Sequence, residues 1–272
     1  MENSICKDIE LLKIQGSAEI TLASLKYLKN FSKLNGFGKK FDREAEKLIS
    51  IRPTAVMLYN TVQILKKKKG TIDELIKRVE TDKEKIALNG FKLIKHGYRV
   101  HTHCHSSEAL SVIKKSAEKN KLTVVVDITQ PKSQGIRTAK ELAKIRNIDV
   151  ILIPDTAAGL ALSPPVLPMD NIVIVGSDAL RKEGVVNKIG TYLLAVASSE
   201  QNIPFYVAAS TLKLDKRKKF KIEERPATEV YRKIKGVTIR NPAFDITPWK
   251  YITGVITEEG IKKPREILMM LK

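Results

Sequence analysis

The hydrophobic positions divide the chain into two parts with different periodicities. Residues 1–93 show helical spacing nearly throughout and contain almost no alternating β-branched runs. A small, flexible patch, Gln15-Gly16-Ser17-Ala18, interrupts the first apolar stripe. That stripe consists of Ile9, Leu11, Leu12, Ile20, Leu22, Leu25 and Leu28. The pattern predicts a helical N-terminal domain over residues 1–93.

Three further helices are expected in this first part. Residues 42–50 predict a short helix, and residues 55–65 predict a second one that follows the turn at Pro53. Residues 71–95 predict a longer amphipathic helix, capped by the side chain of Thr71.

From residue 96 onward, apolar runs alternate with helical segments, which is typical of a parallel sheet covered on both faces. The expected strands are residues 98–103, 122–127, 149–153, 171–175, 203–208 and 255–257, and the expected helices include residues 107–119, 135–146 and 188–200. The predicted fold class is therefore α/β. The helical N-terminal domain precedes a Rossmann-like, mostly parallel doubly wound sheet over residues 94–272.

Composition limits the class of protein. The chain has 272 residues, of which 43% are hydrophobic and 29% charged, so it can bury a full core. Its two cysteines, Cys6 and Cys104, cannot form a disulfide framework, and Cys6 is interpreted as incidental. No apolar run approaches the roughly 18 residues that span a bilayer. We expect a cytoplasmic protein without a membrane partner.

The formal net charge of +19 predicts attraction to polyanions or to phosphorylated small molecules. The densest lysine runs, residues 66–69 and 216–219, fall in predicted loops without interleaved aromatic residues or a nucleic-acid motif. A solvated, lysine-rich surface, as in some thermophile proteins, explains them better than nucleic-acid binding.

Residues 98–113 gather most of the candidate chemistry. They predict a strand that leads into a helix opened by Ser106 and Ser107, with Cys104 where the strand ends. Unpaired amides and the helix dipole at such a start bind anions and stabilise a thiolate. The histidines at 101, 103 and 105 share the opposite strand face, which could suggest zinc. No fourth ligand is indicated, so no metal site and no cofactor are predicted.

A second candidate region follows the predicted strand at 171–175. Asp178 lies just past this strand, and Asn187 and Lys188 are expected at the start of the next helix. Lys188 and helix amides could hold a phosphate, while Cys104 and Asp178 could accept and donate protons. These groups suit an aldose–ketose isomerase acting on a phosphorylated sugar. Without further information, a buried cysteine and a capping aspartate remain alternatives.

Five motifs together carry a resemblance to a known family. The motifs are Arg52-Pro-Thr-Ala-Val56, His103-Cys-His-Ser106, Gly176-Ser-Asp178, Asn187-Lys-Ile-Gly-Thr191 and Asn241-Pro-Ala-Phe-Asp-Ile-Thr-Pro248. With these motifs the chain resembles the archaeal ribose 1,5-bisphosphate isomerases, which belong with methylthioribose 1-phosphate isomerase and the alpha, beta and delta subunits of translation initiation factor 2B. The resemblance implies the same two-domain fold and assembly into dimers or hexamers.

The resemblance also implies roles for individual residues. Cys104 matches the proton acceptor that removes the proton from C2 of the ring-opened sugar, and Asp178 matches the proton donor. The positions expected to bind substrate and phosphate are Gln15, Gly16, Ser17, Ala18, Arg52, Ser106, Ser107, Gln130, Asn187, Lys188 and Lys213. The ligand would be a phosphorylated sugar or a nucleotide-like small molecule.

Two departures from the isomerase pattern keep a second function open. The isomerases carry arginines where this chain has Gln15 and Gln130. Each arginine makes charged hydrogen bonds worth about 1.5–3 kcal/mol. The chain could therefore be a non-catalytic relative of the factor 2B subunits that binds a protein such as initiation factor 2. Residues 241–249 are expected to be a turn-rich loop that either packs Trp249 or contacts a second subunit.

Overall fold

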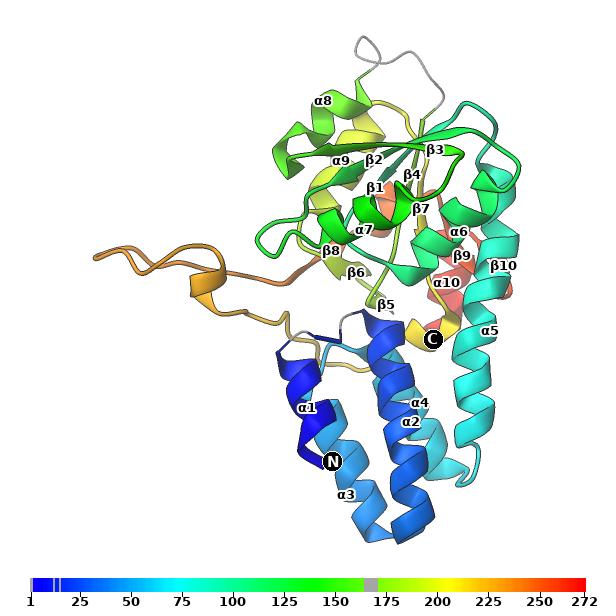
Figure 1. Ribbon diagram of the computed structural model, residues 1–272, viewed down its shortest axis with the longest axis vertical. Coiled ribbons are helices and arrows are strands. Elements are labelled where there is room, and N and C mark those ends of the chain that lie inside the picture. The colour runs from blue at the N-terminus through cyan, green and yellow to red at the C-terminus, as the bar shows by residue number, and fades with distance from the viewer. Residues whose placement is uncertain (1, 12, 15, 164–170) are drawn as a thin grey trace.

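The helical part of the chain forms the lower layer of the molecule in Figure 1. The computed structural model describes residues 2–11, 13–14, 16–163 and 171–272, so Leu12 and Gln15 lie outside the described residues. Helix α2 begins at Ser17, directly after Gly16 with φ 88°, so Ser17 and Ala18 lie in its first turn rather than in a flexible patch. The helices are α1 (Glu2–Glu10), α2 (Ser17–Asn35), α3 (Lys39–Ile51), α4 (Val56–Lys67) and α5 (Ile72–Gly90), which a short 3-10 helix, η1 (Phe91–Leu93), extends.

The apolar stripe accounts for the packing of these helices. Ile9, Leu25 and Leu28 are fully buried, and each contributes about 1.5–3 kcal/mol by leaving water. Leu11 is 67% exposed, because the chain has already left helix α1 at that residue. The predicted side-chain cap of α5 is wrong. The Thr71 hydroxyl donates to the carbonyl oxygen of Lys68 (2.9 Å) instead of accepting from the helix.

The second part is built on a sheet of seven strands among the described residues, in the order β10-β9-β7-β4-β1-β2-β3. All neighbouring strands are parallel except β10, which is antiparallel to β9. The predicted Rossmann-like sheet is therefore confirmed. Its strands are β1 (Arg99–Thr102), β2 (Leu122–Asp127), β3 (Ile148–Ile153), β4 (Asn171–Val175), β7 (Phe205–Ala208), β9 (Gly254–Thr257) and β10 (Gly260–Lys262).

Helices cover both faces of this sheet. Side chains of β4 alternate between two cores: Ile172 and Ile174 pack on the face covered by α5, α6 and α7, and Val173 and Val175 pack on the face covered by α8, α9 and α10. The helices are α6 (Ser107–Ala117), α7 (Gln134–Leu142), α8 (Ala158–Leu162), α9 (Thr191–Glu200) and α10 (Pro264–Met270), and the shorter 3-10 turns are η2 (Asp155–Ala157), η3 (Thr211–Lys213), η4 (Ala227–Glu229) and η5 (Trp249–Tyr251).

A small antiparallel sheet was not predicted. It consists of β5 (Ala179–Arg181), β6 (Gly184–Lys188) and β8 (Phe244–Thr247), in the order β5-β6-β8. Lys188 therefore ends a strand, and the expected helix at 188–200 begins only at Thr191. Residues 241–249 are a strand in their middle rather than a loop, and the Trp249 indole donates to the carbonyl oxygen of Arg181 (2.9 Å).

The two parts share side chains at their junction. Leu212, from η3, is buried in the core of the N-terminal helices, and Val56, from α4, packs with Val186 and Phe244 of the small sheet. Helix α5 runs alongside both parts in Figure 1. This arrangement brings the first turn of α2 and the end of α3 close to the residues that follow β1 and β4.

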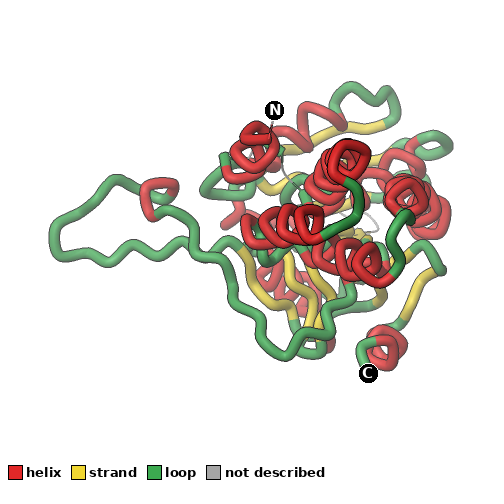
Figure 2. The backbone as a smooth tube through the Cα atoms, turned by 90° about the horizontal axis from the view of Figure 1, so that it is seen from below, coloured by secondary structure: helices red, strands yellow, loops and turns green. Residues whose placement is uncertain are grey.

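An extended arm leaves the body of the molecule between the 3-10 helix η3 and strand β8 (Figures 1 and 2). The arm, residues 219–243, carries the short helix η4 and returns to the small sheet. Within the described residues, no helix is both long and apolar enough to cross a membrane.

Candidate functional site

Cys104 occupies the short link between β1 and α6, as predicted. Its φ is +69°, a left-handed conformation that residues with a Cβ seldom adopt. Its N–H donates to Thr129 Oγ1 and its carbonyl oxygen accepts from Thr138 Oγ1, both at 2.9 Å. Two residues later Ser106 caps α6, accepting from the Ala109 amide (3.3 Å).

The backbone N–H of His105 lowers the pKa of the Cys104 thiol, as expected near a helix start, but burial outweighs this effect. Burial raises the pKa of the Cys104 thiol to about 11, more than the nearby Lys188 cation lowers it. The carboxylates of Asp178 and Asp155 raise the thiol pKa further. In the free protein the thiol is therefore protonated at neutral pH.

Asp178 follows β4 at the same end of the sheet. Burial raises the pKa of its carboxyl, against the lowering effects of the Lys213, Arg52 and Lys188 cations. A carboxyl whose pKa is raised holds its proton to higher pH and is suited to donate it. Gly176 allows the close approach of this loop to α6, because a Cβ at that position would collide with Ser106 Oγ.

Asn187 and Lys188 reach the site from strand β6. The Asn187 amide donates to Thr191 Oγ1 (3.0 Å), which links the strand to the start of α9. The amides at that helix start were expected to hold a phosphate. Two of them are already used, since Asp245 Oδ2 accepts from the N–H groups of Gly190 (2.8 Å) and Tyr192 (3.1 Å).

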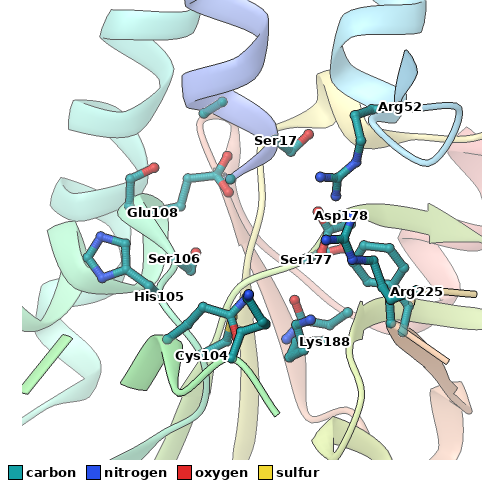
Figure 3. A pocket seen from close by; sticks show the side chains of 18 of the residues that line it. Ser17, Arg52, Cys104, His105, Ser106, Glu108, Ser177, Asp178, Lys188 and Arg225 are labelled. Carbon is teal, nitrogen blue, oxygen red and sulfur yellow. The ribbon is translucent and has the colours of Figure 1, made fainter. Parts of the chain in front are cut away.

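Two cations come from the junction with the helical part. Arg52 ends α3, and its Nε lies 3.3 Å from Glu223 Oε2. Among the described residues its buried Nη1 has no hydrogen-bond partner, and Figure 3 shows the guanidinium directed toward Asp178. Lys213 Nζ, by contrast, is buried, paired with Glu108, and donates to the Ser177 carbonyl oxygen (2.6 Å). An unpaired buried donor indicates a place for an anion.

These side chains line one cavity that opens to solvent. It brings together most of the predicted site residues: Gly16, Ser17, Ala18, Arg52, Cys104, Ser106, Ser107, Asp178, Asn187, Lys188 and Lys213. Gln130 is not part of this lining. Its side chain is exposed, and its backbone N–H donates to Asp155 Oδ2 (2.7 Å). Gln15 lies outside the described residues.

Sequence reasoning missed several charged residues of the lining. Glu108, Lys132, Arg225 and Glu229 all face the cavity. Arg225 Nη2 donates to Glu229 Oε1 (2.7 Å), and Lys132 Nζ lies 3.9 Å from the same oxygen. Lys132 stands two residues after Gln130 and could have been noticed, but Arg225 comes from the arm, which gives no local signal.

The charges of the lining favour an anionic ligand. Five lining residues are cationic, namely Arg52, Lys132, Lys188, Lys213 and Arg225, and three are acidic, namely Glu108, Asp178 and Glu229. The lining thus carries an excess of positive charge, which increases further when Asp178 is protonated.

The histidines form a separate, buried cluster. Asp127 binds His101 Nε2 through Oδ1 (2.8 Å) and His103 Nδ1 through Oδ2 (2.9 Å). Burial alone would lower the His103 pKa, but the hydrogen bond and charge of Asp127 raise it. His105 was expected on the same strand face; it lies beyond β1 and its Nδ1 bonds Thr138 Oγ1 (2.9 Å).

Three groups in this region could hold a metal ion. Ligand atoms of His103, Asp127 and Asp155 lie within 4.8 Å of one another. The Asp155 oxygens accept from the amides of Thr129 (2.6 Å) and Gln130 (2.7 Å), so this carboxylate already organises a turn.

Comparison with known proteins identifies relatives over nearly the whole chain. A model of the Initiation factor 2 subunit family matches residues 13–264. The ribose 1,5-bisphosphate isomerase of Archaeoglobus fulgidus is 39% identical over 281 residues, covering 94% of this chain and 88% of that protein. The methylthioribose-1-phosphate isomerase of Thermosipho africanus is 39% identical over 265 residues, covering 85% of this chain and 75% of that protein. A Pyrococcus horikoshii structure described as translation initiation factor eIF-2B has a TM-score of 0.84 at 32% identity, covering 98% of both chains.

Proposed function

We propose that the chain, which belongs to the Initiation factor 2 subunit family, is a sugar-phosphate aldose–ketose isomerase. The substrate is ribose 1,5-bisphosphate or a close relative, and the product is the corresponding ketose. The observation that carries this proposal is the joint placement of Cys104 and Asp178 in one cavity with an excess of positive charge.

The proposed reaction moves one hydrogen of the ring-opened sugar from C2 to C1 and leaves a carbonyl at C2. The Cys104 thiolate removes the C2 proton, which gives an enol or enolate intermediate. The Asp178 carboxyl, which gave its proton to the ring oxygen as the ring opened, accepts the proton of the C2 hydroxyl, and the Cys104 thiol returns its proton to C1 to complete the ketose. The raised pKa of the Asp178 carboxyl supports its role as the acid.

The reactive form is a thiolate beside a protonated carboxyl. Because the pKa of Cys104 is about 11, the thiol form dominates at neutral pH, and the reactive arrangement forms when the thiol proton moves to an ionised Asp178. The two arrangements differ only in the location of one proton. Their ratio therefore does not depend on pH between the two pKa values, and Lys188 stabilises the reactive one.

Cations at different parts of the cavity support a substrate with more than one phosphate. Arg52 offers an unpaired donor from the helical part, while the N-terminus of α6 at Ser106 and Ser107 offers backbone amides. Lys132 and Arg225 line the cavity and can replace the charge of the arginines missing at positions 15 and 130.

We further propose that the chain forms a homo-oligomer, a dimer or a hexamer. The arm exposes Tyr231 and Val237, and helix α9 exposes Leu193 to 77%. These exposed apolar side chains are the candidates for the contact between subunits. The cytoplasmic location stays a prediction.

The second candidate is a non-catalytic protein related to the factor 2B subunits, which binds a protein partner such as initiation factor 2. Two observations favour it. Gln130 does not line the cavity, and the Cys104 thiol is protonated at neutral pH in the free protein.

An assay of the purified protein with a panel of substrates distinguishes the two candidates. We expect conversion of ribose 1,5-bisphosphate to ribulose 1,5-bisphosphate, with slower or no conversion of methylthioribose 1-phosphate, since a single phosphate leaves part of the cationic lining unpaired. Absence of turnover on both sugars would exclude the isomerase and favour the non-catalytic candidate.

A further inference from the structure

The backbone of Cys104 is held by two threonine side chains from different elements. Thr129 follows β2 and Thr138 lies in α7, and both side chains are buried. Thr129 Oγ1 accepts from the Cys104 N–H and Thr138 Oγ1 donates to the Cys104 carbonyl oxygen, each at 2.9 Å. The two hydroxyls thus bind the backbone N–H and the carbonyl oxygen of Cys104, which has a left-handed φ between β1 and α6.

Each threonine hydroxyl donates one hydrogen bond and accepts another. Thr129 Oγ1 donates its hydrogen to the Asp127 carbonyl oxygen (3.0 Å), so a lone pair faces the Cys104 amide. Thr138 Oγ1 gives its hydrogen to Cys104, so its lone pair accepts from His105 Nδ1, which must carry a hydrogen. The lowered pKa of His105, about 4 because of burial, is consistent with that neutral ring.

The first of these threonines is itself fixed by the sheet. Thr129 has a left-handed φ of 64°, and its N–H donates to Asp155 Oδ1 (2.6 Å), just beyond β3. The left-handed turn at Thr129 is therefore held by Asp155 at the end of β3. Thr129 in turn holds Cys104 at the end of β1.

We infer that Thr129 and Thr138 are positioning residues that hold Cys104 in its left-handed conformation and direct its thiol into the cavity. A cysteine with these backbone hydrogen bonds removed would relax to a negative φ, which is sterically favoured, and its thiol would turn away. Neither threonine belongs to the described lining of the cavity, so neither binds substrate directly. The inference rests on the proposed function for its kinetic part only.

The test uses Thr129→Val and Thr138→Val, which keep the side-chain shape and remove the hydroxyl, in a Cys6→Ser background. Thr129→Ser and Thr138→Ser restore the hydroxyl. The control is Thr61→Val, a fully buried threonine whose hydroxyl donates to the Leu58 carbonyl oxygen (2.9 Å) in α4, away from Cys104.

Both valine variants are expected to lower kcat by about 10- to 100-fold with KM changed less than about threefold, because the thiol is misplaced while the phosphate contacts remain. The serine variants are expected to recover kcat, and the control to keep it. Values of kcat like that of the wild type in both valine variants would overturn the inference.

A second measurement does not depend on turnover. Alkylation of Cys104 by iodoacetamide, followed by mass spectrometry, is expected to slow by about fivefold or more in the valine variants, because the thiol leaves the cavity and the cation of Lys188. The serine variants are expected to react like the wild type. Alkylation as fast as in the wild type, or faster, would contradict the inference even if no sugar phosphate is converted. Slower alkylation in the valine variants, together with no turnover by the wild type, would refute only the proposed function.

Discussion

Two buried polar regions meet near Cys104, and they differ in how completely their groups are paired. In the histidine cluster, Asp127 uses both carboxylate oxygens and His103 both ring nitrogens, and only Nδ1 of His101 has no partner among the described residues. In the cavity, Arg52 keeps an unpaired donor and burial raises the pKa of Cys104 and Asp178.

The difference separates polar groups that stabilise the fold from polar groups kept ready for a ligand. A paired buried carboxylate lowers the energy of the folded chain relative to the same carboxylate left alone. A buried acid and thiol whose charged forms are disfavoured cost stability, and such groups concentrate at functional sites. Substitution in each region should therefore affect a different property.

The largest expected effect is on turnover in the cavity. Asp178→Asn removes the proton donor and is expected to lower kcat by about 10²–10⁴-fold. Its unfolding free energy should not fall, because a neutral amide replaces a carboxyl whose ionised form is disfavoured by burial. Urea denaturation and a turnover assay measure the two quantities. A kcat within tenfold of the wild type would remove Asp178 from the mechanism.

The next effect is on stability in the histidine cluster. Asp127→Ala leaves both imidazoles without their buried partner and is expected to lower the unfolding free energy by about 3 kcal/mol. The matched control is Asp149→Ala, whose carboxylate is 63% exposed and pairs with Lys121, and whose loss should cost less than about 1 kcal/mol. Equal costs in urea denaturation would mean that the cluster does not stabilise the fold.

A smaller effect is expected on substrate affinity. Arg52→Ala removes the guanidinium whose Nη1 has no partner among the described residues and should raise KM by about 10- to 100-fold, the loss expected for a hydrogen bond to a charged phosphate. Arg43→Ala, on the exposed side of the same helix, is the control and should leave KM unchanged. Steady-state kinetics on both variants test this, and an unchanged KM for Arg52→Ala would place the phosphates elsewhere.

The last prediction compares how the alkylation rate of Cys104 and kcat depend on pH. Alkylation of Cys104 needs only the thiolate, so its rate should rise about tenfold per pH unit below the thiol pKa of about 11. Turnover needs the thiolate with the protonated Asp178, so kcat should stay nearly constant between the two pKa values. Both profiles are measured in a Cys6→Ser background. A kcat that also rises tenfold per pH unit would show that no acid is required.

Much of the sheet could be predicted because its strands are continuous apolar runs. All six predicted parallel strands are present, with ends shifted by two residues or fewer. The small sheet could not, since β5 has three residues, and β8 lies between Pro242 and Pro248, which are typical of turns. The position of Lys188 was therefore misjudged.

Within the site, sequence reasoning located residues better than it described their surroundings. Cys104, Asp178 and Arg52 line one cavity as expected. The pairing of Lys213 with Glu108 and the entry of Arg225 from the arm depend on tertiary contacts that no local pattern contains. The direction of the Cys104 pKa shift was predicted wrongly because burial outweighs the nearby cation and the helix start.

The most direct test of the central claim is turnover of ribose 1,5-bisphosphate by the wild type and by Cys104→Ser, side by side. Serine keeps the size of the side chain but is a far weaker acid than the thiol. The proposed mechanism predicts conversion to the ketose by the wild type and a rate at least about a hundredfold lower for the variant. Equal rates, or no conversion by a folded wild-type protein, would contradict it.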